Sequence, residues 1–227
     1  MTKPADLLAG RLDVVRAGVA DAARVAGRDA ADITTIVITK FHPASLVRQL
    51  HDLGVRDFGE NRHQEAVAKA AAVADLELSW HFVGQLQSKK ARQARSYARV
   101  FHSIDRDSVV DALASPETTV DCFVQLNLTD DPGRGGVAEA DVERMAERVA
   151  STVGLTLLGV MAVAPLDVEP RRVFAKLRLV SERVAAIHPA ATSISAGMSG
   201  DYREAILEGA THLRIGSAIT GNRPPPG

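Results

Sequence analysis

The sequence ITTIVITKFHP, residues Ile33–Pro43, combines a strand pattern with a lysine at its end. Its first seven residues are β-branched and include no glycine or proline, which predicts a buried strand. Lys40 follows directly, and a helical pattern begins after Pro43. Burial at such a position would disfavour the ammonium form, lower the lysine pKa and make the amine a better nucleophile toward carbonyls. A lysine at a strand end can also extend its charge into water, so this stretch alone leaves both interpretations open.

Seven further strand patterns follow this one, each separated from the next by a helical pattern or a turn. The eight predicted strands are residues 33–39, 55–58, 78–83, 100–104, 120–128, 155–163, 192–195 and 212–215. Another helix precedes them and ends near Gly27. Eight alternating units predict an α/β fold, a single TIM-like (β/α)₈ barrel with an extra N-terminal helix, and we expect residues 1–227 to form one domain. An open doubly wound sheet is the alternative, but its Gly-x-Gly-x-x-Gly motif is absent after the first strand.

The composition excludes several classes of protein. A net charge of -1 gives no overall attraction to nucleic acid or to an anionic membrane. No apolar run approaches the length of a bilayer span, and the N-terminus lacks a signal-peptide core. Cys122 is the only cysteine, so no intrachain disulfide forms. The basic helix predicted over residues 88–98 lacks interleaved aromatics, and we expect its arginines to form a solvated face. These features predict a cytoplasmic protein that binds neither nucleic acid nor membrane.

Two glycine- and serine-containing turns stand at the ends of the last two predicted strands. Gly197-Met198-Ser199-Gly200 follows the seventh strand and leads into a helix, and Gly216-Ser217 follows the eighth. Glycines let the backbone approach an anion, and hydroxyl and N–H groups donate to it. In a (β/α)₈ barrel, the loops after strands seven and eight often hold a phosphate. Each turn alone could be purely structural, but the two together predict a phosphate site.

A reactive lysine and a phosphate site in one barrel mouth call for a ligand with both a carbonyl and a phosphate. Pyridoxal 5′-phosphate (PLP) is such a ligand, and the sugar phosphate of a lysine aldolase is another. Arg214 helps to distinguish them, because a guanidinium aimed at a pyridine nitrogen keeps that nitrogen unprotonated. Otherwise, Arg214 could form an ion pair at the strand end, for example with Glu60.

The remaining polar residues near strand ends give no metal site. They are Asn61, His81, His102, Asp105 and Asn127. His81 and His102 lack a third ligand at zinc spacing, so we expect them to be structural histidines with satisfied hydrogen bonds. No metal is therefore predicted.

Several short motifs, taken together and in order, are specific to a known family. They are Thr39-Lys40 with Pro43, Phe58-Gly59-Glu60-Asn61-Arg62, Trp80-His81-Phe82-Val83-Gly84, His102-Ser103-Ile104-Asp105, Gly197-Met198-Ser199 with Asp201, and Arg214-Ile215-Gly216-Ser217. Over essentially its whole length, the chain resembles the pyridoxal phosphate homeostasis protein family (the YggS/PROSC proteins). The fold of that family is similar to the barrel domain of alanine racemase, of the fold-type III PLP-binding kind.

The resemblance implies a role for each predicted site residue. The lysine matching Lys40 forms an aldimine with PLP, the arginine matching Arg214 faces the pyridine nitrogen, and the asparagine matching Asn61 lies close to the ring. The residues matching Ser199, Gly216 and Ser217 hold the phosphate.

The resemblance also implies a function without catalysis. We expect a monomeric, cytoplasmic carrier or buffer of PLP in intracellular PLP homeostasis, with no catalytic residues and with PLP-dependent apo-enzymes as possible partners. A fold-type III amino-acid racemase is the alternative, although it needs a second domain and the chain ends soon after the eighth strand. A lysine aldolase acting on a sugar phosphate is the third hypothesis.

Overall fold

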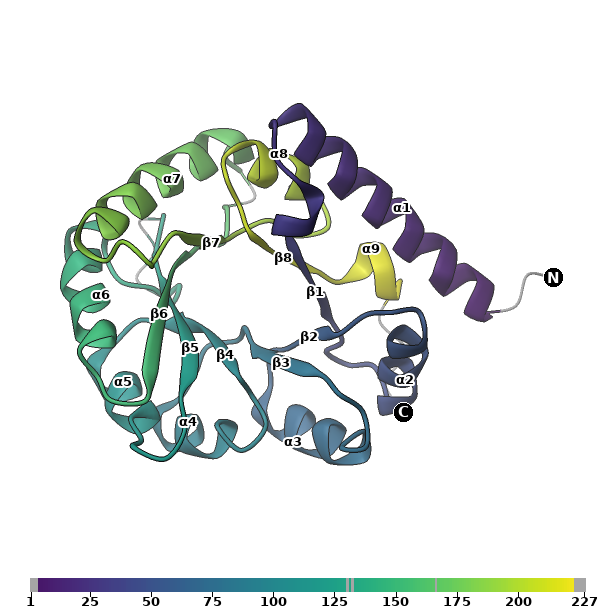
Figure 1. The fold of residues 1–227 in the computed structure, drawn as a ribbon, viewed down its shortest axis with the longest axis horizontal. Coiled ribbons are helices and arrows are strands. Elements are labelled where there is room, and N and C mark those ends of the chain that lie inside the picture. Colours follow the sequence, from purple (N-terminus) through teal and green to yellow (C-terminus); the bar gives the residue numbers. More distant parts are fainter. Residues whose placement is uncertain (1–3, 130, 132, 166, 223–227) are drawn as a thin grey trace.

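Eight parallel strands form a closed barrel with helices around it (Figure 1). The computed structural model describes residues 4–129, 131, 133–165 and 167–222. The strands follow one another around the ring in sequence order, and β1 closes it by pairing with β8. The predicted (β/α)₈ barrel is thus confirmed, and the open doubly wound alternative is excluded. Within the described residues, no helix has the length and apolar character needed to span a membrane.

Helices and strands alternate along the chain. The strands are β1 (Thr34–Ile38), β2 (Asp57–Glu60), β3 (Ser79–Phe82), β4 (Val100–Ile104), β5 (Val120–Gln125), β6 (Leu155–Met161), β7 (Ser193–Ser195) and β8 (His212–Ile215). The helices are α1 (Pro4–Val25), α2 (Ala44–Asp52), α3 (His63–Ala72), α4 (Ser88–Ala94), α5 (Asp107–Leu113), α6 (Val142–Ala150), α7 (Pro170–Ile187), α8 (Tyr202–Leu207) and α9 (Ser217–Thr220). Two short 3₁₀ turns cover Ala30–Asp32 and Glu139–Asp141.

The predicted basic helix is shorter than expected. It ends at Ala94, so Arg99 lies beyond it and does not share a helical face with Arg95. Arg95 is only half-exposed, and its guanidinium donates hydrogen bonds to the backbone carbonyls of Leu113 and Thr118. The interpretation of this helix as a wholly solvated basic face is therefore wrong at Arg95.

The barrel interior contains a small apolar cluster and several polar side chains. Val100, Phe123 and Met161 form an apolar cluster separate from the larger core that lies between helices and strands. His102 on β4 bonds Ser195 on β7, with 2.8 Å between Nδ1 and Oγ. Since β4 and β7 are not neighbours in the ring, this bond has to cross the interior. Polar groups inside a barrel need such partners, because an unpaired buried group is costly.

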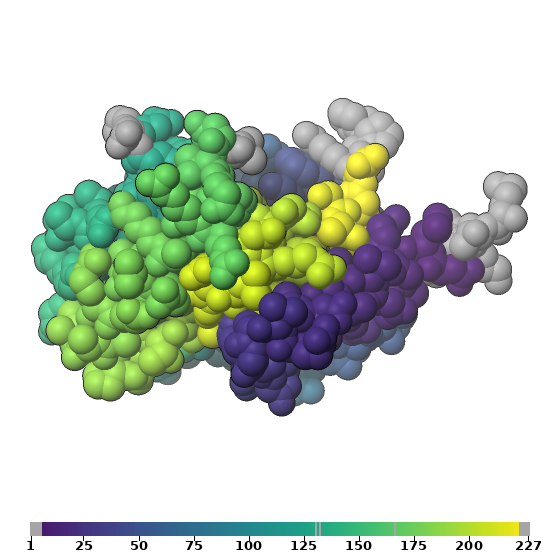
Figure 2. Space-filling model, turned by 90° about the horizontal axis from the view of Figure 1, so that it is seen from above, coloured from purple at the N-terminus to yellow at the C-terminus, as the bar shows by residue number. Residues whose placement is uncertain are grey.

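Helix α1 joins the start of the chain to its last elements. In Figure 2 it lies against the yellow C-terminal segment. Arg11 Nε donates to the carbonyl of Ile219 at 2.7 Å, and Arg28 Nη1 donates to the carbonyl of Ala210 at 2.7 Å. The tyrosine ring of α8 packs closely on this helix, since a Cβ at Gly18 would lie 2.1 Å from the Tyr202 hydroxyl. The extra N-terminal helix thus covers the seam where β8 meets β1.

Candidate functional site

The six predicted site residues come from four consecutive strands of the ring. Arg214 lies on β8, and the others follow the ends of β1, β2, β7 and β8; they are Lys40, Asn61, Ser199, Gly216 and Ser217. Because all strands are parallel, their carboxyl ends meet at one end of the barrel. The fold therefore gathers these residues along one arc of the barrel mouth.

Lys40 is exposed, which agrees with a lysine that extends its charge into water and not with a partly desolvated amine. The strand ends at Ile38, so Lys40 lies two residues beyond it in a turn. Phe41 then adopts a left-handed backbone with φ of 67°, which is unfavourable for a bulky residue. Its backbone N–H donates to Glu65 Oε2 at 3.0 Å, and this bond helps to hold the turn. The turn thus directs Lys40 into solvent at the mouth.

A buried ion pair fastens the end of β1 to the end of β2. Glu60 accepts hydrogen bonds from the Thr39 hydroxyl at 2.6 Å and from the Lys69 ammonium, which also donates to the carbonyl of Thr39 at 2.7 Å. Burial raises the pKa of the Glu60 carboxyl, although the Lys69 charge opposes the shift. Thr39 and Glu60 directly precede Lys40 and Asn61, so this cluster fixes the backbone that presents both. Nothing in the sequence indicated this role for Lys69, because Lys69 stands within an alanine-rich helix where a lysine is expected to face solvent.

Asn61 is held by close backbone packing. A Cβ at Gly84 would lie 2.1 Å from the carbonyl oxygen of Asn61, so the loop after β3 requires glycine there. The side-chain oxygen Oδ1 of Asn61 is buried and accepts no hydrogen bond from the described residues. A buried polar atom without a partner is costly, and a ligand at the mouth could supply the missing donor.

The loop after β7 is fastened to β8 and to the following helices. The Ala218 backbone N–H donates to Ser199 Oγ at 3.2 Å, and the Arg214 backbone N–H donates to the carbonyl of Gly197 at 2.9 Å. Gly197 has φ of +91°, a backbone conformation suited to glycine. Ser217 is exposed and begins α9, so its backbone N–H has no partner within that helix. Hydroxyl and N–H donors from two loops therefore lie in one region of the mouth.

Arg214 is buried, with 5% of its surface exposed. Nη1 donates to Ser195 Oγ at 2.6 Å and Nη2 donates to the carbonyl of Ala162 at 2.9 Å. Burial lowers the pKa of Arg214 to about 10, so the guanidinium remains charged near neutral pH. The ion pair with Glu60 that was considered as an alternative does not form, because Glu60 pairs with Lys69. A guanidinium has five N–H donors, and the described residues accept bonds from two of its nitrogens.

His81 and His102 are structural histidines, as predicted, although they lie on β3 and β4 rather than after them. They bond each other through Nδ1 of His81 and Nε2 of His102 at 3.0 Å. Asp57 and Ser195 complete their hydrogen bonds, and sequence reasoning missed both of these partners. Within the described ranges, no group of histidine, cysteine, aspartate and glutamate side chains could hold a metal ion.

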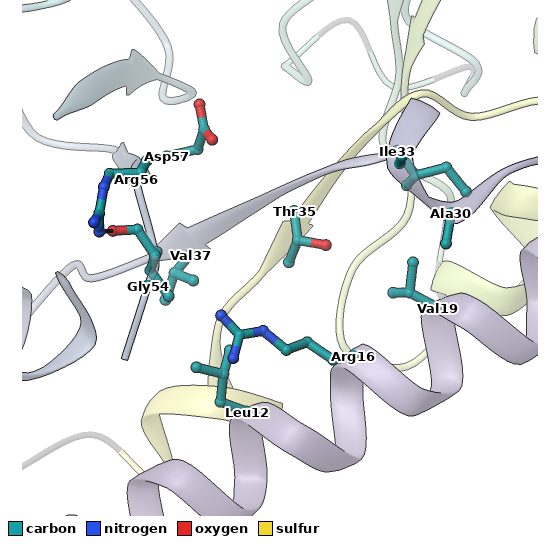
Figure 3. A pocket seen from close by; sticks show the side chains of 12 residues that line it. Leu12, Arg16, Val19, Ala30, Ile33, Thr35, Val37, Gly54, Arg56 and Asp57 are labelled. Carbon is teal, nitrogen blue, oxygen red and sulfur yellow. Dashed lines mark hydrogen bonds between the residues drawn. The ribbon is translucent and has the colours of Figure 1, made fainter. Parts of the chain in front are cut away.

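A cavity of about 490 Å³ lies outside the barrel, between α1, β1 and the segment that leads into β2 (Figure 3). Apolar side chains such as Leu12 and Val19 line it together with Arg16 and Arg56. Arg16 and Arg56 already donate to backbone carbonyls. None of the six predicted site residues lines this cavity, so it is separate from the mouth.

Comparison with known proteins shows the family. A family model described as alanine racemase, N-terminal domain, matches residues 11–224. A pyridoxal phosphate homeostasis protein of Mycobacterium leprae is 38% identical, over 92% of this chain and 90% of that protein. This chain belongs to the pyridoxal phosphate homeostasis protein family. A member of this family from Escherichia coli K12 is 34% identical, over 95% of this chain and 97% of that protein.

Solved structures with the same fold include a protein at 30–31% sequence identity. PipY of Synechococcus elongatus PCC7942 has been solved without PLP, and it is similar with a TM-score of 0.84 and 31% identity, over 94% of this chain and 100% of PipY. PipY with PLP bound is similar with a TM-score of 0.79 and 30% identity, over the same shares. Alanine racemase of Corynebacterium glutamicum has a TM-score of 0.70 at 14% identity, covering 92% of this chain and 60% of that enzyme. That likeness shows a shared barrel alone.

Proposed function

We propose that this chain binds PLP and acts in intracellular PLP homeostasis as a carrier or buffer of the cofactor. Membership of the homeostasis protein family supports this function, and so does the PipY structure with PLP bound. The observation that carries the proposal is Arg214, a buried cation at the mouth with donors left over after its bonds to Ser195 and Ala162. An acceptor nitrogen on a ligand ring matches these donors.

The residues at the mouth fit PLP in their chemistry. Arg214 would donate to the pyridine nitrogen, and Ser199, Gly216 and Ser217 would hold the phosphate. Asn61 would lie beside the ring, where its unpartnered Oδ1 favours a donor from the ligand. When bound, PLP supplies an aldehyde carbon that accepts an amine. The exposed amine of Lys40 would hold that carbon covalently, and exposure leaves it accessible to incoming and departing cofactor.

Two features support a carrier over a racemase. An arginine keeps a facing pyridine nitrogen unprotonated, which makes the ring a weak electron sink. Racemisation also needs a base on each face of the substrate. The two tyrosines of the chain are engaged elsewhere: Tyr97 Oη lies 3.3 Å from His63 Nδ1 between α3 and α4, and Tyr202 packs on α1 at Gly18. Burial raises the pKa of Tyr97 further, which disfavours it as a base.

Incubation of the PLP-loaded protein with L-alanine tests the carrier against the racemase. We expect D-alanine, followed by chiral chromatography, to form far more slowly than an enzymatic rate of about 1 s⁻¹. Turnover in that range, abolished in Lys40→Ala, would overturn the carrier and establish the racemase. A lysine aldolase would instead be colourless as purified and would cleave a sugar phosphate without added PLP.

The phosphate contacts are expected to dominate cofactor retention. Losing a hydroxyl that donates to a charged acceptor typically costs ~1.5–3 kcal/mol. Ser199→Ala and Ser217→Ala should therefore each weaken PLP binding by about ten-fold or more, because ~1.4 kcal/mol is one decade. Equilibrium titration of the cofactor-free protein measures this. Ser151→Ala, at the far end of α6, is the matched control and should bind like the wild type. Wild-type affinity in both mouth variants would place the phosphate elsewhere.

The remaining parts of the proposal concern the cellular setting. We infer a cytoplasmic protein of one domain, residues 1–227, that works as a monomer and delivers PLP to PLP-dependent apo-enzymes. The exposure of Lys40 supports delivery, because a client can approach the covalent link without a lid opening. Transfer of PLP from the loaded protein to an apo-enzyme, compared with free PLP at the same concentration, tests the delivery step.

A further inference from the structure

Four hydrogen bonds join five side chains across the barrel interior, from Asp57 at the start of β2 to Arg214 on β8. Arg214 Nη1 bonds Ser195 Oγ at 2.6 Å, and Ser195 Oγ bonds His102 Nδ1 at 2.8 Å. His102 Nε2 then bonds His81 Nδ1 at 3.0 Å, and His81 Nε2 bonds Asp57 Oδ1 at 3.0 Å. We call this series the interior relay.

The two ends of the interior relay restrict the positions of the protons in it. Arg214 can only donate, and an ionised Asp57 can only accept. Ser195 therefore accepts from Arg214, and its own hydrogen is free to go to His102 Nδ1. With both rings neutral, His102 carries its proton on Nε2 and donates to His81 Nδ1, and His81 carries its proton on Nε2 and donates to Asp57. Ser79 Oγ also lies 3.3 Å from His81 Nε2. For two neutral rings, this is the one direction in which all four bonds are satisfied at once.

The surroundings of His102 favour the neutral ring that this order requires. The ring exposes none of its surface and stacks on Phe123, with 4.6 Å between ring centroids. Burial lowers the pKa of His102 well below its ordinary value, and the charges of His81, Arg214 and His212 act in the same direction. The relay therefore has a neutral histidine at its centre.

We propose that His81 and His102 are positioning residues for the cofactor, because the interior relay holds Ser195, and through it Arg214, in one orientation. This inference rests on the proposed function, since it gives Arg214 a cofactor to face. His81, His102 and Ser195 expose 3%, 0% and 0% of their surface, so water does not compete for these bonds. The Asp57 side chain, 32% exposed, anchors the relay at the opposite end of the barrel from the mouth.

Imidazole nitrogen NMR of the full, cofactor-free chain tests the proton order without any substitution. We expect His102 to stay neutral on either side of the ordinary histidine pKa of about 6.5. A charged His102 below that pH, or a His102 ring whose nitrogens show no hydrogen bonds, would overturn the relay. This result does not depend on PLP binding, so it separates a failure of the relay from a failure of the proposed function.

Three variants test the link to the cofactor. Ser195→Ala removes the acceptor of Arg214 Nη1, and His102→Phe breaks the relay while keeping a ring against Phe123. Each should shift the absorption maximum of bound PLP and weaken PLP binding by about ten-fold. His212→Gln is the control, because His212 lies edge-on to His102 but forms its hydrogen bond with Thr211, outside the relay. This variant should change neither the absorption maximum nor the affinity for PLP.

The outcomes separate positioning from general packing. Unchanged spectrum and affinity in a folded Ser195→Ala would overturn the proposal, even if His102→Phe failed to fold. Equal shifts in all three variants would overturn it as well, because the effect would then belong to the packing of the interior. A shift of the absorption maximum in Ser195→Ala and His102→Phe, without one in His212→Gln, supports the proposal.

Discussion

Replacing Lys40 with alanine is expected to abolish the covalent link between protein and PLP. Lys40 is the exposed amine at the mouth, two residues beyond the end of β1. After borohydride reduction, peptide mapping of the wild-type protein should find the pyridoxyl group on Lys40. Lys40→Ala should lose this label and the visible band that accompanies it. Some PLP should still bind through its phosphate, because the loops after β7 and β8 are unchanged.

Lys89 provides the matched control for this experiment. It is also exposed and follows the next-but-one strand on the mouth side of the barrel, in α4. Lys89→Ala should keep both the label and the visible band. A label that persisted in Lys40→Ala, or that mapped to another lysine in the wild type, would contradict the assignment of Lys40.

The buried ion pair between Lys69 and Glu60 should give the largest change in folding stability. In Lys69→Met the Glu60 carboxylate stays buried without its counter-charge, and breaking a buried pair in this way typically costs about 3–5 kcal/mol. Oε2 of Glu60 already lacks a partner among the described residues, so little is available to compensate. Urea unfolding of the cofactor-free protein should show this loss in free energy of unfolding.

A second substitution tests the cause of that loss. Adding Glu60→Leu to Lys69→Met removes the stranded charge, and the double variant should recover much of the stability, since apolar replacement of a buried pair is often neutral or better. Arg48→Met breaks the exposed pair with Asp75 and should cost far less. If Lys69→Met were as stable as Arg48→Met, the buried pair would not hold the ends of β1 and β2.

The sequence predicted the strands best where local pattern and tertiary setting agree. The bounds of β4 and β8 match the prediction. For β2, the predicted residues 55–58 are displaced from the observed Asp57–Glu60, because the strand continues through Gly59. The missing side chain of Gly59 makes room in the packing, where a Cβ would lie 2.4 Å from Ile38 Cδ1. A glycine required by packing and one required by a turn are alike in sequence.

The positions of the candidate site residues followed from topology, but their supporting contacts did not. Parallel strands bring Lys40 and Ser199 to one mouth whatever the details of packing. Lys69 and Asp57 act through partners far away in sequence, and nothing local distinguishes them from surface charges. The signal for Asp57 is a charged residue at an inward-facing position at the start of β2. That position can be recognised only when the register between β2 and β3 is known.

The pairing of β1 with β8 has a consequence for protein synthesis. Thr34 pairs with His212, so the ring cannot close until β8 has left the ribosome. Until then, β1 presents an unpaired edge that invites contact with other chains. Ser217 and Arg214 emerge with the last strand, long after Lys40. A nascent chain therefore carries the amine without the rest of the proposed binding site, and uptake of PLP would begin only once β8 has left the ribosome and paired with β1.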